Sequence, residues 1–110
     1  MTAVPITWYL LLSAILFTVG TVGALTRRNA ITIFLSIELM LNSANLAVLA
    51  YARLAAARAG DALAATHGQV LVLVVIAVAA AEAAVGLALF IAVYRNRRTI
   101  DVTRLNLLRW

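Results

Sequence analysis

Three long stretches of the chain are almost free of charged residues, and short clusters of arginine flank them. The stretches cover residues 6–26, 30–52 and 69–94. Each holds about 20 or more residues, enough for a helix rising about 1.5 Å per residue to cross a hydrocarbon core of roughly 30 Å. Strands of a membrane β-barrel would instead alternate in polarity over about ten residues. The pattern therefore predicts an all-α integral membrane fold with three transmembrane helices.

Composition supports this assignment and a single domain. Apolar residues make up 65% of the 110 residues and charged residues 12%, whereas soluble domains average roughly 45–50% and about 25%. So small a soluble domain could not bury this much apolar surface. We predict one membrane domain over residues 1–110, with a short cytoplasmic tail at 95–110. Because residues 1–7 lack Lys and Arg, we expect the first stretch to be a retained helix rather than a signal peptide.

The arginines predict how the helices are oriented. With three spans, the first connection and the C-terminus share one side of the membrane. That side holds seven of the nine arginines, namely Arg27, Arg28, Arg95, Arg97, Arg98, Arg104 and Arg109. The other side holds only Arg53 and Arg58. Cytoplasmic loops are enriched in Lys and Arg, so we predict an external N-terminus and a cytoplasmic C-terminus.

Several kinds of chemistry are excluded at this stage. The net charge of +5 is compatible with nucleic-acid binding, but the arginines flank apolar runs and form no basic face interleaved with aromatic residues. A lipid bilayer is the favoured partner, and no nucleic acid is expected. The chain has no cysteine and one histidine, which excludes disulfides and thiolate ligation of zinc or iron–sulfur clusters. We therefore predict no metal or cofactor bound by this chain.

Two glutamates interrupt the apolar stretches. Glu82 lies about 12 residues from either end of the third stretch, and Glu38 about eight residues from the cytoplasmic end of the second. Ionisable groups at such depth cost at least a few kcal/mol and usually face protein or water. Desolvation there favours the neutral acid, which can still load and release protons. We predict a proton relay whose two stations lie at different heights. The alternative is two protonated side chains that only hydrogen-bond neighbouring helices.

Polar residues accompany the first of these glutamates. At about 100° per residue, Asn42 and Asn45 lie about 40° and 20° to either side of Glu38. The three side chains therefore form a polar stripe facing a partner or a hydrated path. The asparagines alone fit interhelical hydrogen bonds, worth about 0.6–2 kcal/mol each, equally well. Arg27 and Arg28 are interpreted from composition as determinants of topology.

Small residues surround Glu82 on all sides of its helix. They are Ala77, Ala79, Ala80, Ala81, Ala83, Ala84, Gly86 and Ala88. Such residues let neighbouring helices approach closely. A helix that is small on every face needs more neighbours than two helices supply, so we predict a larger complex.

Two groups of motifs resemble one known family. The first group reads RRNAI at 27–31, SIELMLN at 36–42 and NL at 45–46. The second reads GQV at 68–70, AAAEAAVGL at 79–87 and YR at 94–95. Together they resemble the K subunit of the bacterial proton-pumping NADH–quinone oxidoreductase, respiratory complex I, whose mitochondrial counterpart is the 4L subunit. The resemblance covers about residues 8–106.

The resemblance implies a location and specific roles. Glu38 and Glu82 match the family's intramembrane glutamates, on a hydrophilic axis joining the quinone-proximal region to the antiporter-like subunits. Arg27 and Arg28 match a cytoplasmic loop that affects coupling. By this resemblance the chain lies in the bacterial inner membrane, and NADH, FMN, iron–sulfur clusters and quinone are bound by other subunits. The family pattern departs at 53–66, which is longer than usual and rich in Ala and Arg.

Three other functions remain open from the sequence. The nearest is the C subunit of multisubunit cation/proton antiporters, which has the same three-helix plan. The stretch AAAEAA at 79–84 favours the complex I family over it. The others are a purely structural assembly subunit whose glutamates stay protonated, and a free-standing oligomer of a small transporter.

Overall fold

The computed structural model describes residues 4–60 and 62–105, so Arg109 lies outside the described residues. They form three α-helices, α1 (Ile6–Thr26), α2 (Ala30–Ala59) and α3 (Ala62–Arg97), followed by the 3-10 turn η1 (Val102–Arg104). All three helices are long and apolar enough to cross a membrane. The predicted all-α integral membrane fold is confirmed.

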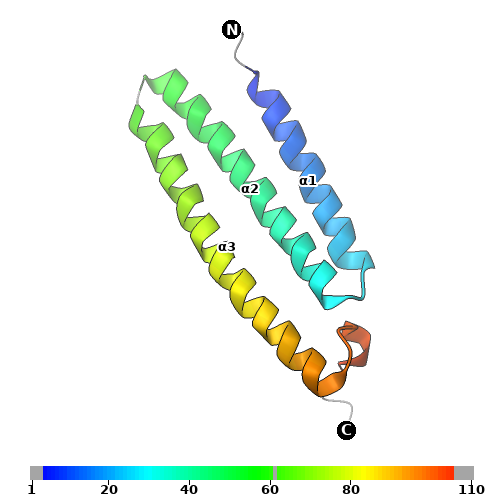
Figure 1. The fold of residues 1–110 in the computed structure, drawn as a ribbon. Coiled ribbons are helices and arrows are strands. Elements are labelled where there is room, and N and C mark those ends of the chain that lie inside the picture. The colour runs from blue at the N-terminus through cyan, green and yellow to red at the C-terminus, as the bar shows by residue number, and fades with distance from the viewer. Residues whose placement is uncertain (1–3, 61, 106–110) are drawn as a thin grey trace.

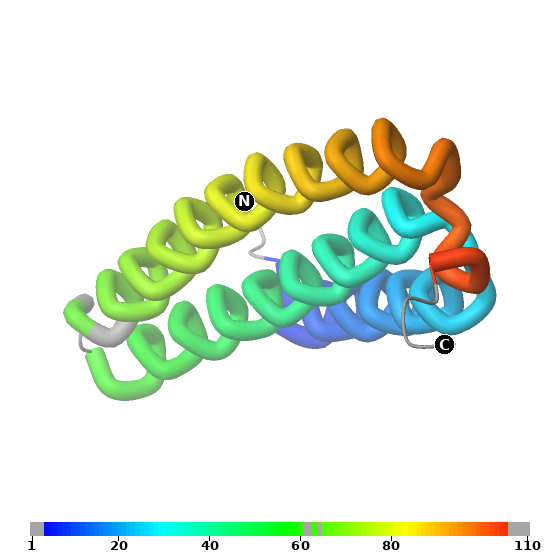
Figure 2. The backbone as a smooth tube through the Cα atoms, turned by 90° about the horizontal axis from the view of Figure 1, so that it is seen from below, coloured from blue at the N-terminus to red at the C-terminus, as the bar shows by residue number. Residues whose placement is uncertain are grey.

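The three helices lie in a row, with α2 in the middle. Each runs antiparallel to the next, and α1 and α3 pack on opposite sides of α2 (Figures 1 and 2). The bundle measures 60 × 26 × 24 Å. Because α3 shares little surface with α1, much of both outer helices is left for lipid or other proteins.

The structure corrects the predicted ends of two helices. The first helix covers 6–26 as predicted, and α2 continues seven residues past 52. The third helix starts seven residues before 69 and continues three residues past 94, so the tail begins after Arg97 and not at residue 95. Apolarity stops at Arg53, but Ala, Leu and Arg are among the strongest helix formers, so the helix itself continues. It ends at Gly60, whose φ of 64° is a left-handed conformation open to glycine at little cost. The apparently long connection at 53–68 is therefore mostly helix.

The α1–α2 contact depends on small side chains. The Ser13 hydroxyl donates to the carbonyl oxygen of Ser43 at 2.6 Å, and Ser43 is fully buried. A Cβ atom at Gly20 would lie 2.6 Å from Met40 Cγ and 2.8 Å from the carbonyl oxygen of Ser36. A backbone oxygen cannot move aside as a side chain can. The absence of a side chain at Gly20 therefore sets the close approach of these two helices.

The α2–α3 contact fixes the register between those helices. Gly68 faces the Cβ atom of Ala52, and a Cβ atom at Gly86 would lie 3.1 Å from the ring of Phe34. The step forward along α2 from 34 to 52 thus equals the step back along α3 from 86 to 68. The Phe34 ring also meets Phe90 edge-on, with centroids 5.6 Å apart. A regular antiparallel register therefore runs along the whole contact.

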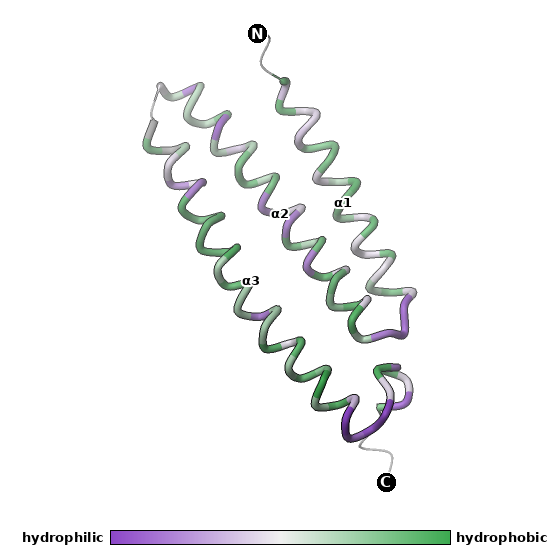
Figure 3. Tube along the Cα trace, viewed as in Figure 1, coloured by the Kyte–Doolittle hydropathy of each residue, from purple (hydrophilic) through white to green (hydrophobic). Residues whose placement is uncertain are grey.

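Polarity along the bundle agrees with a membrane setting. The hydrophilic colour is densest in the α1–α2 connection and at the end of α3, and shorter hydrophilic segments interrupt α2 and the start of α3 (Figure 3). The rest of the helices is largely apolar. Large apolar side chains on all three helices are exposed, including Leu25 at 81%, Leu35 at 61% and Leu73 at 65%. Apolar surface this extensive is not left in water by a soluble monomer.

Candidate functional site

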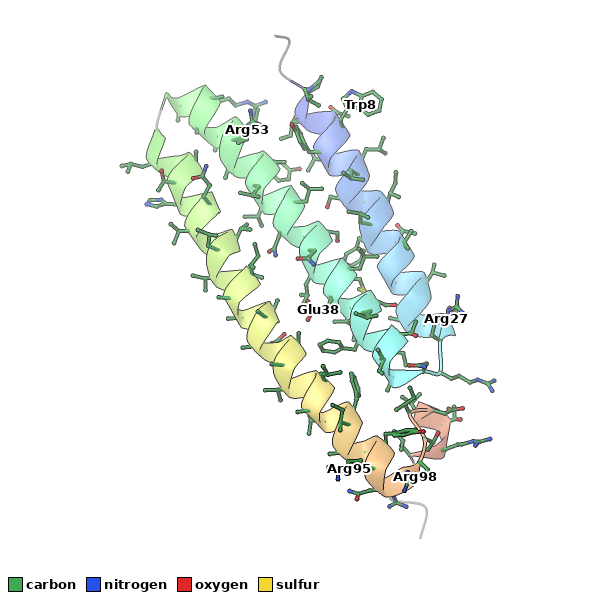
Figure 4. All side chains as sticks on the ribbon, in the orientation of Figure 1. Trp8, Arg27, Glu38, Arg53, Arg95 and Arg98 are labelled. Atoms are coloured by element: carbon green, nitrogen blue, oxygen red, sulfur yellow. The ribbon has the colours of Figure 1, made fainter. Side chains whose placement is uncertain are left out.

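Glu38 lies in the half of α2 that follows the α1–α2 connection, on the side facing α3. The helix begins at a well-formed cap, because the side-chain oxygen of Asn29 accepts from the backbone N–H groups of Ile31 and Thr32 at 2.9 and 3.2 Å. Glu38 follows Phe34 by one helical turn and is half-buried. Its side chain extends toward α3 (Figure 4).

Glu82 lines an open groove beside α3. The groove has a volume of about 590 Å³, and all its other lining residues are apolar. They are Phe34, Val78, Ala81, Val85, Gly86, Leu89 and Phe90. Glu82 itself is exposed in the isolated chain. A carboxyl group is thus presented to whatever covers an otherwise apolar surface.

The two glutamates lie at the same level of the bundle. Phe34 contacts Gly86 across the α2–α3 interface. Glu38 lies one turn beyond Phe34, and Glu82 one turn before Gly86, which is the same direction in space because the helices are antiparallel. The antiparallel register therefore sets Glu38 opposite Glu82. The prediction of two stations at different heights is wrong.

The apolar stretches that contain the two glutamates do not end at the same level, so equal depth in the bundle corresponds to different distances from their ends. By the same register, the start of α2 at Ala30 lies opposite Phe90, and α3 continues to Arg97. This extension is about 10 Å long. It is visible in Figure 1 as the part of α3 below the start of α2. Both glutamates lie about 12 Å, or eight residues, from the level at which α2 begins.

The predicted polar stripe divides at the α2–α3 interface. Phe34 and Ala52 mark the line on α2 that contacts α3. At about 100° per residue, Glu38 and Asn45 lie within about 40° of this line, and Asn42 about 80° from it. In agreement, Asn45 is half-buried and Asn42 is exposed. Glu38 and Asn45 therefore face α3, while Asn42 points to the outer surface.

Arg27 and Arg28 form a three-residue connection with Asn29, and both arginines are exposed. No pattern in the sequence indicated that the tail after α3 returns to this connection. Asn29 and Asp101 form an isolated antiparallel bridge. Ala30 N–H donates to the carbonyl oxygen of Ile100, and Val102 N–H to that of Arg28, each at 2.9 Å. The return is visible at the lower end of Figure 4.

A local signal for the shape of this tail was present in the sequence. Asp101 is followed two residues later by Thr103, the spacing of a side-chain turn cap. One oxygen of Asp101 accepts from the Thr103 hydroxyl at 2.6 Å and from its N–H at 2.9 Å. These hydrogen bonds, helped by the nearby charges of Arg104 and Arg28, lower the pKa of the Asp101 carboxyl. Asp101 is therefore ionised at neutral pH, at the arginine-rich end of the bundle.

Comparison with known proteins identifies the family. Residues 8–110 match the family of NADH-ubiquinone/plastoquinone oxidoreductase chain 4L. The chain belongs to this family. NADH-quinone oxidoreductase subunit K of Roseiflexus castenholzii is 55% identical over 106 residues, covering 96% of this chain and 98% of that protein. Subunit K 2 of Geotalea uraniireducens is 53% identical, covering 93% and 94%, and subunit K of Salinibacter ruber is 50% identical, covering 93% and 93%.

Membership of the chain 4L family confirms the resemblance found in the sequence. The match includes the connection at 27–29, both glutamates and the tail through residue 105. It favours a subunit of NADH–quinone oxidoreductase over the antiporter subunit considered above. In a chain 4L protein the exposed apolar faces have a ready explanation, because the oxidoreductase is a multisubunit assembly with other subunits to cover them.

Proposed function

We propose that this chain is a membrane-arm subunit of a proton-pumping NADH–quinone oxidoreductase in which Glu38 and Glu82 exchange protons as one coupled pair. The observation that carries the proposal is their common level on neighbouring antiparallel helices. Ionisable side chains within membrane spans commonly mark proton relays. Their common level places one such side chain on each of two neighbouring helices.

The surroundings of the pair support a path that continues into other subunits. Glu38 is half-buried on the side of α2 that faces α3, whereas Glu82 is exposed and lines an otherwise apolar groove. A proton held between the helices therefore has an outlet on a surface that a neighbouring subunit can cover. We propose the antiporter-like and quinone-proximal subunits as those neighbours, with NADH, FMN, iron–sulfur clusters and quinone held elsewhere in the complex.

The loop arginines are part of the same proposal. Arg27 and Arg28 lie just before the start of α2, which is about 12 Å from Glu38 along that helix. Both arginines are exposed. We propose that they take part in coupling at the cytoplasmic surface. Their exposure and charge suit contact with a neighbouring subunit there.

The coupled pair is tested with variants that shorten each side chain but keep it titratable. Glu38→Asp, Glu82→Asp and the double variant are compared for proton pumping in native membrane vesicles, normalised to assembled complex. Neighbouring residues typically show interaction energies of about 0.5–3 kcal/mol. The proton-pumping rate of the double variant should therefore differ at least about twofold from the rate expected by multiplying the effects of the two single variants.

The control pairs Glu38→Asp with Arg58→Gln, since Arg58 is exposed near the far end of α2. Distant sites are usually additive, so this pair should follow the product of its single effects. If the Glu38 and Glu82 double variant also pumps at the rate given by multiplying its single effects, the two glutamates act independently.

We propose that the arginine-rich end is cytoplasmic and that the chain lies in the bacterial inner membrane. The end with the α1–α2 connection and the tail holds six of the eight arginines among the described residues, which the positive-inside rule assigns to the cytoplasm. A periplasm-active reporter fused to the N-terminus should be active, and one fused to the C-terminus inactive. The reverse pattern would overturn the orientation.

A further inference from the structure

The arginine-rich end of the bundle is closed by a contact between segments far apart in the sequence. Residues 99–104, here called the strap, leave α3 and return to the connection between α1 and α2. Two backbone hydrogen bonds of 2.9 Å flank the Asn29 and Asp101 bridge. They join the carbonyl oxygen of Arg28 and the N–H of Ala30 to the strap. The loop arginine is thus held through its backbone, which leaves its side chain exposed.

The strap is shaped before it reaches the loop. Arg98 reverses the chain in a left-handed conformation with φ of 56°, and its N–H donates to the carbonyl oxygen of Tyr94 at 2.7 Å. The hydroxyl of Thr99 accepts from the N–H of Asp101 at 3.1 Å. Asp101 then caps η1 through Thr103. These local hydrogen bonds direct the Val102 N–H toward the loop. The strap therefore loses little further conformational freedom when it pairs with the loop.

The strap is also a direct link from α3 to the α1–α2 connection. The two outer helices lie on opposite sides of α2 (Figure 2). The part of α3 that carries Glu82 leads without interruption to the turn at Arg98. A displacement of α3 along its axis would therefore act on the loop at Arg28 through the strap, as well as through the packing of α2.

We propose that the strap is a positioning element that fixes Arg27 and Arg28 relative to α3, and that Val102 acts as a positioning residue through its backbone N–H. The inference rests on the proposed coupling role of the loop arginines. It assigns to the chain's C-terminal segment a task that the glutamates do not perform. The strap holds the loop in one geometry while the proton-exchanging pair operates at the level above it.

Val102→Pro removes the donor of one bridge hydrogen bond and changes little else. Val102 is the first residue of η1, where proline is tolerated. Asp101 before it has φ of −73° and ψ of 114°, the extended region that a following proline favours. The Val102 side chain is 43% exposed, so Val102→Ala keeps the N–H at small packing cost and is the matched control.

In native membranes, Val102→Pro should lower quinone reductase turnover at least about threefold with normal complex content and unchanged KM for quinone. Val102→Ala should retain wild-type turnover. A loss confined to turnover in assembled complex separates positioning from folding. If the proline and alanine variants have equal turnover, the proposal is overturned.

A cysteine pair tests the strap without reference to the proposed coupling role. The two hydrogen bonds lie on the residues flanking Asn29 and Asp101, so these two residues form a non-hydrogen-bonded antiparallel pair, with Cα atoms about 4.5 Å apart. This distance permits a disulfide, and the chain has no other cysteine. Asn29→Cys with Asp101→Cys should form an internal disulfide in assembled complex on mild oxidation. If no disulfide forms, the proposed contact between the strap and the loop is contradicted.

The same pair then decides whether the strap must stay closed. When the cysteine pair is combined with Val102→Pro, formation of the disulfide should restore quinone reductase turnover. Reduction of the disulfide should lower turnover again. A lower turnover in the oxidised than in the reduced form would overturn the proposal, because the strap would then have to open. If the disulfide forms but Arg27→Gln and Arg28→Gln leave quinone reductase turnover normal, the proposed coupling role of the loop arginines is contradicted. The contact between the strap and the loop is then still supported.

Discussion

Glu82→Gln should lower coupled NADH–quinone reductase turnover and proton pumping by at least about tenfold, with normal amounts of assembled complex. A positioned proton-transferring group typically contributes about 10²–10⁴-fold where it participates directly, so about tenfold is a lower bound. Glutamine has the size and polarity of a neutral carboxylic acid and adds no charge to the membrane-spanning helix. The exposed position of Glu82 in the groove lining should therefore accept glutamine without loss of assembly.

Glu82→Asp separates proton exchange from hydrogen bonding. Aspartate keeps the titratable group but withdraws it by the length of one methylene group, so we expect part of the activity to remain. If Glu82 only joins helices, the order reverses, because glutamine preserves the length of the side chain and its hydrogen bonds. Pumping in the two variants, normalised to assembled complex, distinguishes these cases. Glutamine performing as well as wild type would exclude proton exchange at Glu82.

Glu38→Gln should also lower proton pumping by about tenfold or more. Glu38 is half-buried on the α3-facing side of α2 and lies at the level of Glu82. Glutamine preserves its packing against α3 but cannot exchange a proton at any ordinary pH. The measurement is proton uptake into inverted vesicles per electron transferred, together with quinone reductase turnover.

Asn42→Ala is the control for the Glu38 variant. It lies one turn from Glu38 but is exposed and turned away from the α2–α3 interface. We expect it to change pumping less than Glu38→Gln does. If pumping per electron and turnover both stay normal in an assembled Glu38→Gln complex, Glu38 serves only to hold helices together.

The sequence by itself determined the number of helices, their antiparallel order and the family. Apolar runs of membrane length can satisfy their backbone hydrogen bonds only as helices in lipid, so three such runs with short connections leave one plan. The first apolar stretch coincides with α1. The Ala-rich connection around Gly60 was compatible with a short helical extension, but the predicted bounds of 52 and 69 fell short of it. Apolarity marks what lies in lipid, whereas helix propensity and Gly60 decide where the helix ends.

Only the tertiary structure decided how the candidate functional residues are placed relative to each other. Depth counted within one helix cannot give the register between two helices, which here depends on where Gly68 meets Ala52 and Gly86 meets Phe34. That register sets Glu38 opposite Glu82. The strap was likewise invisible to periodicity, because its bridge joins backbone groups of Arg28 and Val102 that no side-chain pattern records. Close backbone approach and long-range backbone pairing become visible only when the helices are assembled.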